Sequence, residues 1–471
     1  MFQNRRRAMQ RMTLAGLLAL AFAAAAADPA AQDFSKEAAR TSPAWVHDGI
    51  VYEIFPRNFS QQGNFSAITA QLERLQKLGV TILWLMPIHP QGKLESKGTL
   101  GSPYSVRDYY AINPQYGSAA DLHRLVREAH RRQMKVIIDI VANHTAWDSV
   151  MMRHPDFYEH GAGGRIVPPR PEWADVAHLE YTRAGVPNRA LRTYMKDMLV
   201  HWIKDFDLDG FRCDVAFGVP TDFWEDARAA LIQIKPDILM LAEADSPELL
   251  VKAFDVDYAW SMYHPLAEVL QGRQPASTLR EAWTTANARY PRGALHLRFA
   301  DNQDEPRALA RFGEQAALAA SALMFTLDGV PLLYNGMEVG DSTESAAPAL
   351  FEKLPVFWAS SELRPQFPVF FHELIALRKA HPALREGDVQ WLHNSDESRV
   401  LTFARRGGGE NLLVAINLST LPFAGLVAIP DGEFEDITPR AVASDAALPG
   451  VARLPSLSLG TWQYRVFRAR Q

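Results

Sequence analysis

The stretch VTILWLMP, residues 80–87, is apolar at every position from Ile82 to Met86 and ends at a proline. A strand with one face in solvent alternates apolar and polar residues, whereas a strand buried on both faces does not. Strands of the second kind are typical of parallel sheets whose faces are covered by helices. This stretch therefore favours an α/β fold.

Seven other short apolar runs have the same character, and segments with helical periodicity, such as residues 67–79 and 118–133, lie between the runs. The runs are IVYEIFP from Ile50, KVIIDIV from Lys135, DGFRCDV from Asp209, ILMLAEA from Ile238, a weaker FDVDYAW from Phe254, ALHLRFAD from Ala294 and VPLLYNG from Val330. Eight such units predict a (β/α)8 TIM barrel over residues 45–384. An open doubly wound sheet is the alternative, but no dinucleotide-type glycine turn follows the first strand.

Two parts of the chain depart from this rhythm. Residues 145–187 are rich in Gly and Pro and have no long apolar period, which predicts a short inserted domain after the third strand. From residue 385 to 471, short segments such as RVLTFARR, NLLVAINLS and TWQYRVFRA are separated by Gly, Asp and Pro. They predict a C-terminal antiparallel β-sandwich domain.

The N-terminus has the composition of an export signal. MFQNRRRAMQRM is basic, the following run is apolar and rich in Ala, and a small-residue cleavage site precedes Asp28. We interpret residues 1–27 as a signal peptide and expect an exported protein, periplasmic or secreted. A membrane anchor is the alternative, although the run is short for a span of about 20 residues. No second stretch of spanning length follows, so we expect no integral membrane segment after cleavage.

Bulk composition narrows the classes of partner and site. The 471 residues are 48% hydrophobic, enough for a large core, and the formal net charge of -5 does not favour nucleic acid. The single cysteine, Cys213, excludes an intrachain disulfide. It has no neighbouring His or Cys with which to bind a metal.

Three carboxylates follow predicted strands directly: Asp214 after the fourth, Glu243 after the fifth and Asp304 after the seventh. The carboxyl ends of barrel strands face one bowl, so we expect these acids to converge, together with Arg212 and His144. Glycoside hydrolysis needs a pair of acids, only about 5 Å apart when configuration is retained, and a third anion nearby keeps the proton donor protonated. Taken singly, each acid is also compatible with a helix cap or a backbone turn.

At these residues the chain resembles the α-amylase family, glycoside hydrolase family 13. DIVANH from Asp139, GFRCDV from Gly210, AEA around Glu243 and DNQDE from Asp301 are similar to the four family motifs, in order and on the expected strands. GVTILWLMPIHP from Gly79 and SPYSVRDYYAINPQYG from Ser102 are also similar to family members.

The resemblance implies a role for each matching residue. Asp214 would be the nucleophile, Glu243 the general acid/base and Asp304 the transition-state stabiliser, with Arg212 hydrogen bonded to the nucleophile. His144 would contact the primary hydroxyl of the sugar. Tyr104 would stack under the sugar ring that is cleaved. A loop-anchoring aromatic remains the alternative for Tyr104, and a strand-end hydrogen bonder for His144.

The sequence also departs from the family. Gln303 stands where the family usually has histidine. Glutamine donates a hydrogen bond but cannot become cationic, so we expect weaker transition-state binding or a shifted pH optimum. VAFGVP after Asp214 lacks the Lys-His pair of many α-amylases, which assists sugar and calcium binding. Asn143 and Asp175 are possible calcium ligands, but a hard cation needs six or more oxygens, so calcium is left open and no cofactor or metal is predicted.

The leading hypothesis is an exported retaining hydrolase of α-1,4-glucosidic bonds in starch-derived glucans, maltooligosaccharides or cyclodextrins. A transglycosylase or isomerase of the same family is the first alternative, and a catalytically silent glucan-binding homologue is the second. The partner expected is an α-glucan or oligosaccharide. Oligomeric state, chain-length preference and endo or exo action do not follow from the sequence.

Overall fold

The computed structural model describes residues 33–439 and 451–470. The predicted signal peptide, residues 1–27, lies outside these ranges. Within them, every helix is too short or too polar to span a bilayer.

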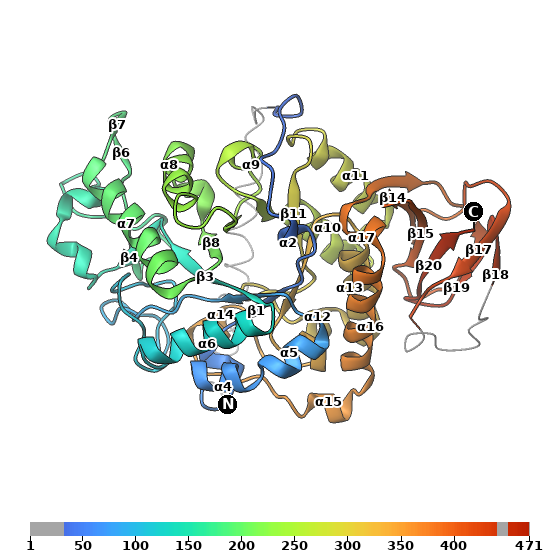
Figure 1. Cartoon of the computed structure of the whole chain (residues 1–471), viewed down its shortest axis with the longest axis horizontal. Coiled ribbons are helices and arrows are strands. Elements are labelled where there is room, and N and C mark those ends of the chain that lie inside the picture. The colour runs from blue at the N-terminus through green and yellow to red at the C-terminus, as the bar shows by residue number, and fades with distance from the viewer. Residues whose placement is uncertain (1–32, 440–450, 471) are drawn as a thin grey trace, which may run out of the picture.

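Eight parallel strands close into a barrel, as the sequence predicted (Figure 1). Around the barrel the order is β1, β12, β11, β10, β9, β8, β3 and β2. Their bounds are β1 (Val51–Ile54), β2 (Ile82–Leu85), β3 (Lys135–Val141), β8 (Gly210–Asp214), β9 (Leu239–Ala242), β10 (Val256–Tyr258), β11 (Leu295–Arg298) and β12 (Val330–Tyr334). All eight coincide with the predicted apolar runs, the weak run around Phe254 included.

Both faces of these strands are buried, which explains the absence of alternation in the sequence. The lower interior of the barrel is filled by apolar side chains from every barrel strand except β8, among them Val51, Ile82, Ile137 and Leu239. The outward residues pack on the surrounding helices in a second, larger cluster. Charged side chains enter the interior only toward the carboxyl ends of the strands, and this places the polar site at one mouth of the barrel.

Helices cover the outside of the barrel. The longer ones are α6 (Ala119–Arg131), α7 (Arg189–Phe206), α8 (Thr221–Leu231), α10 (Trp260–Leu270), α11 (Ser277–Asn287), α13 (Glu314–Thr326) and α16 (Gln366–Ala380). The short ones are α2 (Ala44–His47), α3 (Pro56–Phe59), α4 (Phe65–Ala70), α5 (Leu72–Leu78), α9 (Leu249–Lys252), α12 (Ala308–Phe312), α14 (Ala347–Phe351), α15 (Ser360–Leu363) and α17 (Pro382–Glu386).

The apolar period located these helices but did not show where one of them is interrupted. In α6, a capping box between Ser118 and Asp121 satisfies the first N–H groups and starts the helix there. The helix predicted over residues 67–79 is divided at Gln71 into α4 and α5. The segment from Phe367 to Leu384 is divided after α16 because Pro382 cannot continue the helical hydrogen bonds.

The insertion after β3 consists of short elements: β4 (His144–Ala146), the 3-10 turns η1 (Val150–Arg153) and η2 (Pro155–Phe157), β5 (Val176–His178), β6 (Thr182–Arg183) and β7 (Val186–Pro187). Antiparallel pairing of His144 with His178 ties β5 to the end of β3. This pairing brings the insertion to the mouth of the barrel, while the β6–β7 hairpin extends away from it (Figure 1).

The C-terminal part is an antiparallel, strand-rich domain at the opposite end of the molecule, beside α13, α16 and α17 (Figure 1). Its six-stranded sheet has the order β13 (Asp388–Leu392), β14 (Val400–Gly407), β15 (Glu410–Asn417), β20 (Tyr464–Ala469), β17 (Gly432–Asp436) and β18 (Val451–Leu454). A two-stranded sheet, β16 (Phe423–Leu426) with β19 (Ser456–Leu459), packs on it through an apolar cluster that includes Val400, Leu413 and Leu457. The exact domain boundaries stay predictions.

Candidate active site

Arg212 is the central cation of the barrel mouth. Its Nη1 donates to both carboxylate oxygens of Asp139 at 2.9 Å and to Oδ1 of Asp214 at 3.0 Å. The register of β3 and β8 places Asp139 directly beside Arg212. At Gly210, where φ is +147°, a Cβ would lie 1.9 Å from the carbonyl oxygen of Leu239, so only glycine lets β8 start this close to β9.

Glu243 lies on the other side of the same guanidinium. Its Oε1 is 3.0 Å from Nη2 of Arg212, and its Oε2 accepts a hydrogen bond from the N–H of Val215 at 2.8 Å. Val215 has a φ of 46°, a left-handed conformation that a β-branched residue rarely adopts. This strained residue directly follows Asp214 and links the backbone of one acid to the side chain of the other.

The protonation of the two acids differs. The pKa of Glu243 is raised to about 7, mainly by burial and also by the nearby charge of Asp214, while Arg212 opposes both. Burial also raises the pKa of Asp214, but Arg212 and a hydrogen bond from Glu243 lower it. Asp214 accepts hydrogen bonds and Glu243 donates one. The pair can therefore act as an anion, Asp214, beside a proton donor, Glu243.

Asp304 enters the site from the loop after β11. The side-chain oxygen of Asn302 accepts hydrogen bonds from the N–H groups of Asp304 and Glu305, at 3.0 and 3.1 Å, and so shapes the turn. Gln303 donates from Nε2 to Oδ2 of Asp304 at 2.8 Å. Burial, followed by the charge of Glu243, raises the pKa of Asp304 well above its usual range. Asn302 thus holds the backbone of the loop beside Asp304.

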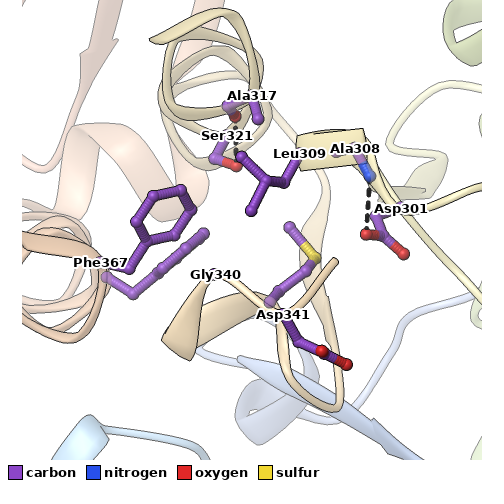
Figure 2. Close-up of a pocket in the computed structure, with 10 residues that line it drawn as sticks. Asp301, Ala308, Leu309, Ala317, Ser321, Gly340, Asp341 and Phe367 are labelled. Carbon is purple, nitrogen blue, oxygen red and sulfur yellow. Dashed lines mark hydrogen bonds between the residues drawn. The ribbon is translucent and has the colours of Figure 1, made fainter. Parts of the chain in front are cut away.

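A small cavity lies behind this loop, and residues that line the cavity hold the loop in place (Figure 2). Oδ2 of Asp301 accepts a hydrogen bond from the N–H of Ala308 at 2.9 Å, which fixes the far end of the loop to α12. Phe367 and Asp341 form part of the opposite wall. The cavity measures about 10 Å³, room for about one water molecule and far too little for a sugar. The residues around the cavity therefore hold the loop, and the cavity itself is not a sugar site.

The aromatic residues face the charged centre. The O–H of Tyr104 donates to Oδ2 of Asp139 at 3.3 Å, and the Cζ atom of Arg212 is 5.7 Å from the centre of the Tyr104 ring. His144 is buried, and burial lowers its pKa to about 4, so its imidazole is neutral at pH 7. The ring of Trp173, from the insertion, lies 5.8 Å from that of His144. The insertion thus supplies one wall of the site.

The two possible calcium ligands have other partners in the structure. Asp175 pairs with Lys97, whose Nζ is 2.7 Å from Oδ1 of Asp175. The amide of Asn143 donates to the carbonyl oxygen of Gly218 at 3.2 Å and lies 3.3 Å from Nε2 of His178. Within residues 33–439 and 451–470, no three His, Cys, Asp or Glu side chains are grouped as metal ligands would be.

The arrangement of three acids on the strand ends of a parallel barrel agrees with a family comparison. Residues 39–159 and 176–362 match the family model described as "Alpha amylase, catalytic domain". The chain belongs to the alpha-amylase family. The family, the fold class and the enzyme class of glycosyl hydrolase predicted from the motifs are confirmed. Residues 160–175, which include Trp173, lie outside the matched ranges.

Individual relatives agree with this assignment. An alpha-amylase (MalA) of Haloarcula japonica is 29% identical over 417 residues, which cover 83% of this chain but only 58% of that protein. A cyclomaltodextrinase of Geobacillus thermopakistaniensis is 27% identical, over 80% of this chain and 70% of the relative. The crystal structure of a maltogenic alpha-amylase (AmyB) from Thermotoga neapolitana superposes with a TM-score of 0.80 at 28% identity, covering 90% of this chain and 99% of that one.

The structure brings all seven site residues predicted from the sequence to the same mouth of the barrel, but their roles in this member of the family stay predictions. It adds residues that the sequence analysis did not single out, namely Asp139, Glu53 and Trp173. The inward position of Asp139 could have been predicted, because the alternation along β3 puts it on the same face as Ile137, inside the barrel. The position of Trp173 could not have been predicted from the sequence, since this residue lies in an irregular segment.

Proposed function

We propose that this protein is a retaining glycoside hydrolase that cleaves α-1,4-glucosidic bonds in starch-derived glucans, maltooligosaccharides or cyclodextrins. The observation that carries the proposal is the shared cation: Arg212 lies 3.0 Å from Asp214 and 3.0 Å from Glu243. Because both carboxyl groups contact one guanidinium, they lie near each other, as the separation of about 5 Å used in retention requires.

The first step joins the sugar to Asp214. The carboxylate of Asp214 forms a bond to the anomeric carbon while the bond to the leaving oxygen breaks, and Glu243 gives its proton to that oxygen. A neutral Glu243 near pH 7 fits this role, because burial raises its pKa to about 7. Arg212 stabilises the ionised form of Asp214 before the attack.

The second step releases the sugar. Glu243, now ionised, takes a proton from water, whose oxygen bonds to the anomeric carbon as the ester to Asp214 breaks. Both acids return to their starting states, so the reaction needs no further reactant. Asp304, held by Gln303, would hydrogen bond the sugar hydroxyls in the transition state, with Tyr104 stacked under the ring and His144 at its primary hydroxyl.

The test is a pair of variants assayed on maltoheptaose. Asp214→Ala removes the nucleophile, and we expect a fall in kcat of at least about 10⁴-fold. Asp222→Asn is the matched control, because Asp222 is exposed and pairs only with Arg192 on the surface. A fluorinated glucosyl substrate should leave an adduct on Asp214 in the parent enzyme, detectable by mass spectrometry. Retained turnover in Asp214→Ala would overturn the proposal.

One observation favours transfer to a second sugar as an alternative outcome. Phe217, in the 3-10 turn η3 (Ala216–Gly218) just after the nucleophile, is 44% exposed. It stands where many α-amylases carry the Lys-His pair. An exposed ring there offers an acceptor sugar a stacking surface. Turnover in ¹⁸O-labelled water distinguishes the two reactions, because only hydrolysis places the label in the product.

We also propose that the protein is exported, on the basis of its basic and then apolar N-terminus. Expression of the full chain in a bacterial host, followed by N-terminal sequencing of the periplasmic and secreted fractions, tests this. A mature protein that begins near Asp28 is expected. A chain that keeps residues 1–27 and stays in the cell would contradict export.

A further inference from the structure

Glu53 is an acid in the interior of the barrel for which the reaction above has no use. It lies in β1, where the strand register places it beside Trp84 of β2 and Tyr334 of β12. Its backbone oxygen accepts a hydrogen bond from the N–H of Asn335, and its side chain is fully buried. No donor in the described part of the chain makes a hydrogen bond to either carboxyl oxygen. Buried carboxyl groups without partners are rare, so this one calls for an explanation.

Three donors in the same interior are also without partners among residues 33–439 and 451–470: Nε1 of Trp84, the O–H of Tyr258 and Nε of Arg212. They lie close together. The Cζ atom of Arg212 is 5.2 Å from the ring centre of Trp84 and 5.6 Å from that of Tyr258, and the two rings are 6.4 Å apart. A carboxyl group and three donors that lie in one buried region and lack partners can be joined through an ordered water.

The charged groups around Glu53 disfavour its ionised form. The titratable and charged groups that face it are Arg212, Asp139, Asp301, Asp304, Tyr258 and Tyr334. Arg212 already contacts Asp139, Asp214 and Glu243. An ionised Glu53 would compete with Asp214 for the same cation. Burial, together with the charges of Asp304 and Asp139, raises the pKa of Glu53 well above its usual range, and Arg212 opposes this only in part.

We infer that Glu53 is a positioning residue, a neutral carboxylic acid beneath the catalytic acids that holds the Nε side of Arg212, Trp84 and Tyr258 through hydrogen bonds to an ordered water, without adding charge. Arg212 is thereby fixed from below while its two terminal nitrogens serve the acids above. The effect on catalysis rests on the function proposed above. The protonation of Glu53 does not, and can be measured separately.

Two variants and a control separate charge from hydrogen bonding. Glu53→Gln keeps the hydrogen-bonding shape but carries no titratable proton, and Glu53→Leu removes both. Asp257→Asn is the matched control. Asp257 is also a buried acid of a barrel strand, but it faces outward and is hydrogen bonded to His296 and Tyr290. Burial raises its pKa only to about 6, so at pH 7 it carries little proton in the folded state.

The first measurement counts protons released on unfolding by urea at pH 7 in weak buffer. A neutral Glu53 loses its proton when the chain unfolds, so the parent should release about one proton more than Glu53→Gln, and Asp257→Asn should match the parent. Equal release by the parent and Glu53→Gln would show that Glu53 is ionised and would overturn the inference. This outcome does not depend on any activity.

The second measurement uses kcat and KM on maltoheptaose. Glu53→Gln should keep kcat within about threefold and the same alkaline limb of the pH profile, because it copies the neutral acid. Glu53→Leu should lose at least about tenfold in kcat with KM nearly unchanged, since the donors it leaves are unsatisfied. An alkaline limb displaced to lower pH in Glu53→Gln, or full kcat in Glu53→Leu, would contradict the inference. If Glu53→Leu does not fold, Glu53→Gln alone decides.

Discussion

Gln303 donates a hydrogen bond from Nε2 to Oδ2 of Asp304 over 2.8 Å, so the residue that departs from the family still supports the third acid. What glutamine lacks is the ability to carry a charge. Histidine at this position would keep the donor and add a partial positive charge beside Asp304 and Glu243.

We therefore expect Gln303→His to raise kcat by about two- to tenfold at pH 6 with an unchanged product pattern, because a charge-assisted hydrogen bond is stronger than a neutral one. Gln303→Ala, which removes the donor, should lower kcat by about tenfold. Chromatography of the products from maltoheptaose checks both variants. A change in products would show instead that the site has been adapted to another acceptor.

Arg212→Lys should damage both activity and stability. A lysine presents one ammonium group and cannot contact Asp139, Asp214 and Glu243 together, so we expect kcat to fall by at least about 100-fold. The unfolding free energy should fall by about 3–5 kcal/mol, because buried carboxylates lose their partner. Urea unfolding and steady-state kinetics measure the two effects. Arg74→Lys, which alters a partly exposed ion pair with Glu338, serves as the control and should retain kcat.

The stability of the fold should fall as pH rises from about 4 to 8. Burial raises the pKa of Asp139 to about 8 and that of Asp301 to about 7. Acids with a raised folded-state pKa contribute stability that is complete below their unfolded pKa near 4 and is lost through the folded value. Asp209 has the opposite sign, since its pKa is lowered to about 2 by hydrogen bonds and by Lys235, and its contribution disappears only in stronger acid.

Asp301→Asn tests this directly. Asparagine keeps the oxygen that accepts from Ala308 but binds no proton, so the pH slope of the unfolding free energy between pH 4 and 7 should decrease by up to about 1.4 kcal/mol per pH unit. Denaturant titrations at pH 4.5, 6 and 7.5 measure the slope. Parallel curves for the parent and the variant would mean that Asp301 is ionised throughout. The exposed residue Asp222 again supplies the control, as Asp222→Asn.

We expect Tyr104 to contribute through its ring more than through its hydroxyl. The O–H makes one long contact of 3.3 Å to Asp139, which Arg212 already holds. Tyr104→Phe should therefore change kcat/KM by no more than about threefold, whereas Tyr104→Ala should lower it by at least about tenfold through lost stacking on the sugar. If both variants lose the same activity, the hydroxyl is the essential part.

Chelation should leave the enzyme active. Lys97 occupies the position beside Asp175 with its own positive charge, and the amide of Asn143 is bonded to Gly218. We expect the melting temperature and kcat to be unchanged after treatment with a calcium chelator, as followed by calorimetry and a reducing-sugar assay. A lower melting temperature that added calcium restores would show that a cation binds elsewhere.

The sequence predicted the barrel because the composition of its strands shows that both faces are buried. A run such as residues 82–86 has no polar side chains that could face solvent. It also located Asp214, Glu243 and Asp304, since strand ends share one mouth whatever the loops do. The division of the predicted helix at Gln71 was missed, because the apolar period continues across that residue. The β19 strand was not singled out because it has only four residues.

The contacts of Asp139, Glu53 and Trp173 needed coordinates. Asp139 and Glu53 belong to strands whose predicted role was apolar packing, and the pairing register decides which cation they meet. Trp173 lies near His144, 29 positions away in the sequence, because β5 pairs with β4. Local pattern carries no information on such a contact.

Arg212 contacts three acids with one guanidinium, and this limits how the residues at the barrel mouth can change in evolution. A substitution at Asp139, Asp214 or Glu243 alters the charge that the other two experience, so the effects of paired substitutions should not add. These positions are therefore expected to evolve as a group.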